Sequence, residues 1–185
     1  MARSDPHNSS RYWQVPDVPG MSLLHADFTA HDYAPHVHEA FVVAVTEIGG
    51  SEFKSRGKLG AARVGALLVF NPAEPHSGRM GGSTRWRYRS FYLAESGISD
   101  VLQLLGTDQV RYFTSNVFHD QDLVSRFLNF TVCSMNSAMT RRRMLSWSRN
   151  CWSAASAHCS NGMGKRSSAY RGCLWKDRSC HRYWN

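Results

Sequence analysis

The chain has 185 residues and a formal net charge of +8, with 42% apolar, 12% aromatic and 19% charged residues. That length allows one domain with a packed core and excludes two ordinary domains. The composition is typical of a globular protein, and the positive charge directs attention to nucleic acid as a partner.

The positive charge is confined to the C-terminal part of the chain. Residues 1–126 hold 12 Lys and Arg against 13 Asp and Glu, whereas residues 127–185 hold 10 against 1. All five cysteines lie beyond residue 127, and no Val or Ile follows Val132. A segment without β-branched aliphatics has little from which to build a core. We therefore expect residues 133–185 to be a basic, poorly ordered tail of different origin from the rest.

The first twenty residues contain no apolar run of the length that a signal peptide or a membrane span requires. We therefore expect a cytoplasmic protein without a membrane partner. That compartment is reducing, which argues against a disulfide framework. The cysteines are also odd in number, and they lie in the segment least able to form a core. They include no C-x-x-C pair, which argues against a zinc module.

Several short segments, bounded by Gly, Pro or Asn, have the composition of β-strands. They are residues 21–28, 41–48, 52–56, 66–70 and 85–93. The last of them alternates most clearly, with Trp86 and Tyr88 on one face and Arg87 and Arg89 on the other. The aromatic face is typical of either a core or a pocket, and the arginine face of a surface that is solvated or covered by a partner. Many short strands at close spacing predict a sandwich or a small barrel.

The hydrophobic period then changes to that of helices. Four aliphatic residues within 98–105 recur at helical spacing, with Ser96 as the N-cap and Gly106 as the stop. A second helix is predicted to begin near Asp120, because apolar residues again recur three and four apart. Beyond about Phe130 no element is predicted.

Three histidines have the spacing expected of a common site. His36 and His38 lie two apart in extended chain, so their imidazoles point to the same side, and His76 follows another apolar strand. If the strands close into a barrel, the three rings converge inside it. Three imidazoles suit Zn, Fe or Mn with an open coordination position, or an organic ligand that they bind by hydrogen bonds. A metal centre of an oxygenase normally includes a carboxylate. Glu39 would point to the opposite face of the strand from His38, and Glu47 lies far along the next apolar run. We therefore expect no metal and no cofactor.

No catalytic nucleophile and base can be identified. No Ser lies in a G-x-S-x-G elbow, and no Cys is near the histidines in the sequence. We therefore expect no catalytic residues and a protein that is not an enzyme.

Three motifs in this chain carry a family resemblance. They are H-x-H-E beginning at His36, N-P-x-E-x-H beginning at Asn71 and W-x-Y-R beginning at Trp86. Together with the stretch PDVPGMSLLHADFTAHDYAPHVHEAF, which contains the first motif, they resemble the N-terminal sensor domain of AraC-type bacterial transcription regulators. The resemblance covers about residues 12–130. It implies a mainly β, cupin-like jelly-roll barrel that binds a small effector, followed by one or two helices that dimerise.

The resemblance also implies an organisation and a set of contacts. The barrel would span residues 1–118, the linker or dimerisation helix 119–132, and the non-native-like basic tail 133–185. The candidate effector contacts are those that match motif positions near the barrel interior: His36, His38, His76, Trp86 and Tyr88.

The sequence departs from the family after the second helix. AraC-type regulators continue into two helix-turn-helix units that read DNA, and such units need amphipathic helices with an aliphatic core. After Val132 this chain offers only Leu145 and Leu174 besides Met and Ala. We hypothesise that the reading frame shifts shortly after Arg126 and truncates the protein before its DNA-binding domain. Sequencing the locus tests this, because another frame should then encode a helix-turn-helix downstream.

Three hypotheses of function follow. The leading one is the effector-sensing and dimerisation domain of an AraC-type regulator, a homodimer that contacts DNA only non-specifically through its basic tail. The second is a metal-dependent cupin enzyme acting on a small molecule, although Val42 or Val43 occupies the place where its carboxylate is expected. The third is a basic nucleic-acid-binding protein that acts through residues 127–185.

Overall fold

The structure is a computed structural model that describes residues 6–16 and 18–135. The predicted tail, 133–185, therefore lies outside the described residues except for its first three positions. The strands are β1 (Ser9–Gln14), β2 (Met21–Phe28), β3 (Asp32–His36), β4 (Phe41–Ile48), β5 (Gly50–Ser55), β6 (Lys58–Arg63), β7 (Leu67–Phe70), β8 (His76–Arg79), β9 (Trp86–Leu93) and β10 (Val117–Phe118). The helices are α1 (Glu95–Leu105), which follows β9, and α2 (Gln121–Met135), which follows β10.

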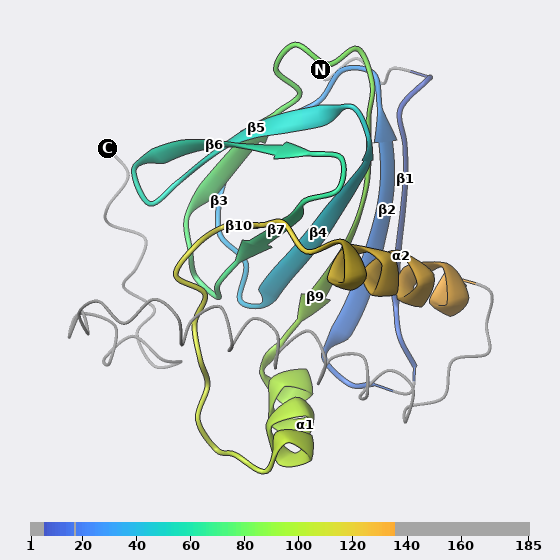
Figure 1. Cartoon of the computed structure of the whole chain (residues 1–185). Coiled ribbons are helices and arrows are strands. Elements are labelled where there is room, and N and C mark those ends of the chain that lie inside the picture. Colours follow the sequence, from blue (N-terminus) through green and yellow to red (C-terminus); the bar gives the residue numbers. More distant parts are fainter. Residues whose placement is uncertain (1–5, 17, 136–185) are drawn as a thin grey trace.

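The strands form two antiparallel sheets. The larger has the order β1-β2-β9-β4-β7-β10, and the smaller has the order β3-β8-β5-β6. The two sheets enclose an interior, while α2 lies across the outside of the larger sheet and α1 lies at one end of the barrel (Figure 1). The mainly β fold class that the sequence predicts, with short antiparallel strands followed by two helices, is confirmed.

Apolar side chains fill the space between the sheets in two clusters. One joins β2, β9 and the start of β3, and the other joins β4, β5, β6 and β7. Their buried members are Ala26, Phe28, Met80, Trp86 and Tyr88 in the first cluster and Val42, Phe53, Ala62, Leu68 and Phe70 in the second. Gly60 is required in the second, because a Cβ there would lie 2.4 Å from the ring of Phe53.

A third cluster lies on the outer face of the larger sheet, beneath the helices. Phe41, Val43 and Val45 of β4 belong to it, together with Val124 and Phe127 of α2. Since β4 is covered on one face by the smaller sheet and on the other by α2, its sequence is a nearly continuous apolar run. This explains why residues 41–48 show no hydrophobic alternation.

Most predicted strands are found close to their predicted bounds. Residues 21–28 and 41–48 match β2 and β4, and 52–56, 66–70 and 85–93 are each shifted by no more than two residues. The other five strands were not predicted. β1, for example, is an edge strand whose side chains are almost all exposed, so it has no apolar face for the sequence to reveal.

The helix boundaries are partly as predicted. Gly106 ends α1 in the left-handed conformation, at φ 65°, as expected. Ser96 as the N-cap is wrong: α1 begins at Glu95, and the capping position is Ala94, which makes no side-chain cap. Asp120 precedes α2 and its Oδ1 accepts a hydrogen bond from the backbone N–H of Leu123 at 3.0 Å, which places the start of α2 where the sequence predicts it.

The arginine face predicted for Arg85, Arg87 and Arg89 is solvated only in part: the side chain of Arg85 is 48% exposed and that of Arg87 is 32% exposed, but both bind Asp27. Arg87 binds Asp27 on the neighbouring strand β2, and Arg89 donates from Nε to Glu47 Oε1 at 2.8 Å. The Arg89 side chain is only 11% exposed. These ion pairs were not predicted, because the carboxylates come from strands β2 and β4, whose register beside β9 the sequence does not reveal.

Candidate functional site

The three predicted histidines meet in the structure. His36 ends β3 and His76 begins β8, and the two are paired across these strands, while His38 follows β3. One ligand nitrogen from each ring lies within 4.8 Å of the others. The ring centroids of His36 and His76 are 4.4 Å apart, and those of His38 and His76 are 5.2 Å apart. We refer to these three residues as the imidazole cluster.

Backbone carbonyls fix the tautomers of two rings in the cluster. Nδ1 of His36 is 2.7 Å from the carbonyl oxygen of Ala34, and Nδ1 of His76 is 2.8 Å from that of Glu74. Because a carbonyl oxygen only accepts, Nδ1 carries the proton, and in the neutral ring Nε2 is left as an acceptor. Nε2 of His38 then donates to Nε2 of His36 across 3.1 Å.

Two rings of the cluster, those of His38 and His76, are uncharged at neutral pH. His76 is only 7% exposed, and its ring stacks on Phe70 at a centroid distance of 3.8 Å. Burial is the main cause that lowers the pKa of His76 to about 4; the nearby imidazoles add to it, and the backbone hydrogen bond to Glu74 opposes it. Burial and the neighbouring His36 lower the pKa of His38 to about 4 as well.

Aromatic side chains extend from the cluster into the barrel. The ring of Tyr33 is 5.9 Å from that of His36, and its hydroxyl is 2.5 Å from the hydroxyl of Tyr88. Trp86 stacks on Tyr88 at 4.4 Å, and its ring centroid lies 6.1 Å from that of Tyr33. Both predicted aromatic residues therefore face the interior, with Tyr88 connected to the imidazole cluster through Tyr33. That these residues contact an effector remains a prediction.

Sequence reasoning did not select Tyr33 and Tyr92 as site residues. Tyr92 packs edge-on against His38 at 5.2 Å. Tyr33 lies three residues before His36, a spacing that puts the two side chains on opposite faces of an ideal strand. A register shift between them in the β3–β8 pair brings both to the same side. The tyrosine at position 92 was recognisable, since it follows Trp86 and Tyr88 on the same face of β9.

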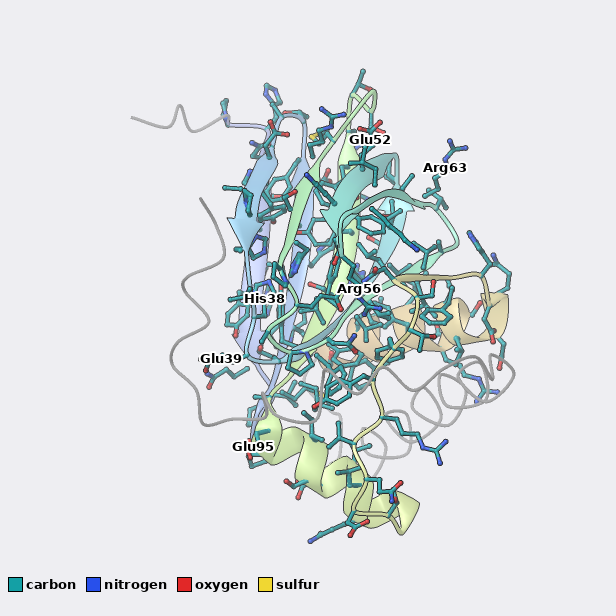
Figure 2. All side chains as sticks on the ribbon, turned by 90° about the vertical axis from the view of Figure 1, so that its left-hand side faces the viewer. His38, Glu39, Glu52, Arg56, Arg63 and Glu95 are labelled. Atoms are coloured by element: carbon teal, nitrogen blue, oxygen red, sulfur yellow. The ribbon has the colours of Figure 1, made fainter. Side chains whose placement is uncertain are left out.

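No carboxylate joins the imidazole cluster among the residues that the structure describes. Glu39 is exposed and points away from the body of the domain (Figure 2). Glu47 binds Arg89 on the outer sheet face, and the carboxylate of Glu74 is bound by Arg56 and Ser55.

The cluster fits a metal ion only in part. In a tetrahedral zinc site, the ligand nitrogens lie about 2.1 Å from the ion and therefore about 3.4 Å from one another. Nε2 of His36 and Nε2 of His38 are 3.1 Å apart, but the three-residue set spreads to 4.8 Å. Rotation of the rings would therefore be needed before three nitrogens could hold one ion.

Comparison with known families agrees with the motifs. The family described as "AraC-like ligand binding domain" matches residues 18–136. The chain belongs to this family. The match includes the imidazole cluster, the aromatic face of β9 and both helices. The resemblance indicated by the three motifs is thereby confirmed, and the chain is an AraC-like ligand-binding domain over most of its length. Comparison with curated proteins finds no match.

Solved structures with a similar fold are distant in sequence. AerE from Microcystis aeruginosa is 11% identical with a TM-score of 0.48, over 63% of this chain and 49% of that one. The DMSP lyase DddQ from Ruegeria pomeroyi DSS-3 is 15% identical with a TM-score of 0.37, over 41% and 39%. A cupin 2 conserved barrel domain protein from Salinispora arenicola CNS-205 is 13% identical with a TM-score of 0.43, over 52% and 84%. This chain thus spans less than half the length of the first two, and likeness at this level indicates nothing about ligand or reaction.

Within the described residues, neither helix has the length and apolar character needed to cross a membrane.

Proposed function

We propose that this AraC-like ligand-binding domain is the sensor of a transcription regulator and that it binds a small-molecule effector at the imidazole cluster. The observation that carries the proposal is the convergence of His36, His38 and His76 from separate parts of the sequence. Such a grouping of a few polar rings beside the apolar and aromatic side chains of the barrel interior is typical of a small-molecule site.

The chemistry of the site indicates the kind of effector. The rings of His38 and His76 are uncharged near neutral pH, and His76 presents Nε2 as an acceptor. The hydroxyls of Tyr33 and Tyr88 add polar groups, and Trp86 adds a flat apolar surface. We expect a small ligand with hydroxyl or amino groups on a planar or ring-shaped body. It would act by binding two arrangements of the domain with different affinity.

A thermal-shift screen of the full chain against sugars, aromatic acids and amino acids tests this proposal. A ligand at about 100 times its Kd should stabilise the fold by about 2.7 kcal/mol and raise Tm by roughly 5–10 °C. The shift should disappear in His76→Gln, because that variant loses the acceptor nitrogen and the ring stacked on Phe70. His25→Gln is the matched control, since His25 lies on the outer sheet face beside Glu47. A ligand whose shift survives His76→Gln and fails in His25→Gln would contradict the proposed site.

We propose further that the protein is a cytoplasmic homodimer that pairs through α2 and contacts DNA only non-specifically. The resemblance to AraC-type regulators, whose helices dimerise, supports the pairing. Residues 127–185 carry nine positive charges in excess. Gel-shift titration should show binding that is independent of DNA sequence and is lost as salt rises from about 50 to about 200 mM. A nanomolar, sequence-specific shift at physiological salt would refute this.

A metal-dependent cupin enzyme is the second candidate, because Nδ1 of both His36 and His76 is held by a backbone carbonyl. Metal-bound histidines are commonly oriented in this way. His36, His38 and His76 would hold the ion, and a bound Zn, Fe or Mn would polarise a substrate oxygen or activate water.

Elemental analysis separates the two candidates. A sensor without a metal should contain well under one equivalent of Fe, Mn or Zn. Near-stoichiometric metal that is lost in the double variant His36→Ala, His76→Ala, and retained in the control His25→Ala, would instead favour the enzyme.

A further inference from the structure

The side chain of Glu74 is buried and fully occupied by hydrogen bonds. It is 6% exposed and accepts from Ser55 Oγ at 2.6 Å and from Arg56 Nη2 at 2.5 Å. Asn116 Nδ2 donates to it at 2.6 Å, and Asn71 donates through its backbone N and its Nδ2 at 3.1 and 2.9 Å. Burial opposes ionisation, but these donors, Arg56 first, lower the pKa of Glu74 below its usual value. The carboxylate is therefore charged and has no capacity left for a ligand.

The backbone of the same loop holds the ring of His76 and the main chain of His38. The carbonyl oxygen of Glu74 accepts from Nδ1 of His76 at 2.8 Å, and the backbone N–H of Ala73 donates to the carbonyl oxygen of His38 at 2.8 Å. The loop 71–76 is therefore bonded directly to the ring of His76 and to the main chain of His38.

Backbone conformation marks the same network as unusual. Arg56 has φ 50° and Ala73 has φ 57°, and in the described part of the chain they are the only residues other than glycine with positive φ. At Arg56 this conformation belongs to the two-residue turn between β5 and β6, where Gly57 also has positive φ, as a tight hairpin requires. At Ala73 no such turn accounts for it, and the left-handed region is disfavoured for residues with a Cβ. Both residues adjoin Glu74, one as the donor to its carboxylate and the other as its neighbour in the chain.

The other side of the network holds the segment that leads into α2, residues 113–120, which we call the connecting segment. Asn71 Nδ2 donates to the carbonyl oxygen of Phe113 at 3.1 Å, and the Phe113 N–H donates back to Asn71 Oδ1 at 2.9 Å. Arg56 Nη2 also donates to the Phe113 carbonyl, at 2.9 Å. Asn116 reaches the carboxylate of Glu74 directly. Side-chain hydrogen bonds thus join the connecting segment to Glu74 and its partners. Backbone hydrogen bonds join the loop of Glu74 to the imidazole cluster.

We propose that Glu74 is a positioning residue that couples the imidazole cluster to the connecting segment, so that occupation of the cluster alters how firmly the segment before α2 is held. The role of the effector in this coupling rests on the proposed function. The coupling itself is a property of the folded chain, because close-packed, hydrogen-bonded groups transmit a displacement that a loose loop would absorb.

The first test compares Glu74→Gln with Asp27→Asn in the full chain. Asp27 is a matched control, since it is a mostly buried carboxylate that binds two arginines, Arg85 and Arg87, on the outer sheet face. Glu74→Gln should shift the imidazole nitrogen NMR signals of His76 and speed amide hydrogen exchange in the connecting segment by about tenfold or more. Asp27→Asn should leave both unchanged. Lost stability in Glu74→Gln with unmoved His76 signals would overturn the proposal, because Glu74 would then have only a structural role.

The second test runs in the opposite direction, since coupling between two sites is reciprocal. His76→Ala should speed exchange in the connecting segment, whereas His25→Ala should not. When Glu74→Gln is already present, adding His76→Ala should change the exchange rate of the connecting segment by less than about twofold. An effect of His76→Ala that is the same with and without Glu74 would overturn the proposal.

If Glu74→Gln does not fold, Asn116→Ala replaces it, because it removes one donor and leaves the ion pair with Arg56. It should shift the His76 signals, and unshifted signals would overturn the coupling. None of these samples contains an effector, so failure of the proposed ligand site would leave the result of both tests intact.

Discussion

Lowering the pH from about 7.5 to about 5 should reduce the free energy of unfolding by about 2 kcal/mol through His76 alone. The pKa of this ring is about 4 in the folded chain, whereas the ordinary value is 6.5. Above pH 6.5 the ring is neutral in both states and the stability contribution is complete. Between pH 6.5 and 4 the unfolded chain takes up the proton and the folded chain does not, so stability falls as the pH falls.

Other rings change the size of this effect but not its sign. Burial also lowers the pKa of His38, to about 4, and lowers that of His25 and His31. Each of these rings destabilises the fold in acid. The carboxylates of Asp27 and Glu74, whose pKa values are lowered, become important only at still lower pH.

Urea denaturation at about pH 7.5, 6 and 5, with EDTA present to keep metal from the imidazoles, measures the effect. His76→Gln removes the ring, so its stability should fall by about 2 kcal/mol less than that of the wild type over the same interval. An equal pH dependence in the two proteins would show that His76 titrates normally in the folded state. The ring would then be more exposed to water than the geometry of the imidazole cluster indicates.

Truncation of Phe127 should have the largest effect on stability, at about 3–5 kcal/mol for Phe127→Ala. This side chain is fully buried, at 0% exposed, and its ring packs on Phe91 of β9 at a centroid distance of 5.9 Å. It belongs to the cluster that fixes α2 against the larger sheet, together with Val43 and Val45. The cavity left by the ring removes both the buried apolar surface and its contacts.

The matched control is Val132→Ala on the same helix, where partial exposure predicts a loss within about 1 kcal/mol. Urea denaturation gives both values. Hydrogen exchange should also show that Phe127→Ala loosens residues 121–132 more than it loosens β8, because the cavity opens beneath α2. A loss below about 1 kcal/mol in Phe127→Ala would mean that α2 contributes little to the fold, contrary to its burial.

The elements with a strong local pattern were predictable from the sequence. Strand β4 is an uninterrupted apolar run, and β9 alternates between aromatic and charged residues, so both were found with nearly correct bounds. β1 and β6 are edge strands with mostly exposed side chains, and no hydrophobic pattern marks them. Gly106 marked the end of α1, because glycine readily adopts the left-handed conformation there. Asp120 marked the start of α2, because its carboxylate caps a backbone N–H only three residues away.

Some residues of the candidate site were also predictable from local sequence patterns, and others were not. The spacing of His36 and His38 places both rings on one side of extended chain, and the motifs identify the family. That Tyr33 joins them depends on a register shift, and that Glu74 binds Arg56 rather than a ligand depends on the placement of the β5–β6 turn beside the loop 71–76.

The amino-acid sequence by itself determined the β class, the two helices, the family and the histidines worth examining. Only the tertiary structure decided that His36 and His76, forty residues apart, share one site, and that the arginines of β9 are neutralised by β2 and β4. The reason is the range of the interactions. Hydrophobic period and capping are set by residues a few positions apart, whereas strand order and sheet closure are set by contacts between distant segments, which no local pattern records.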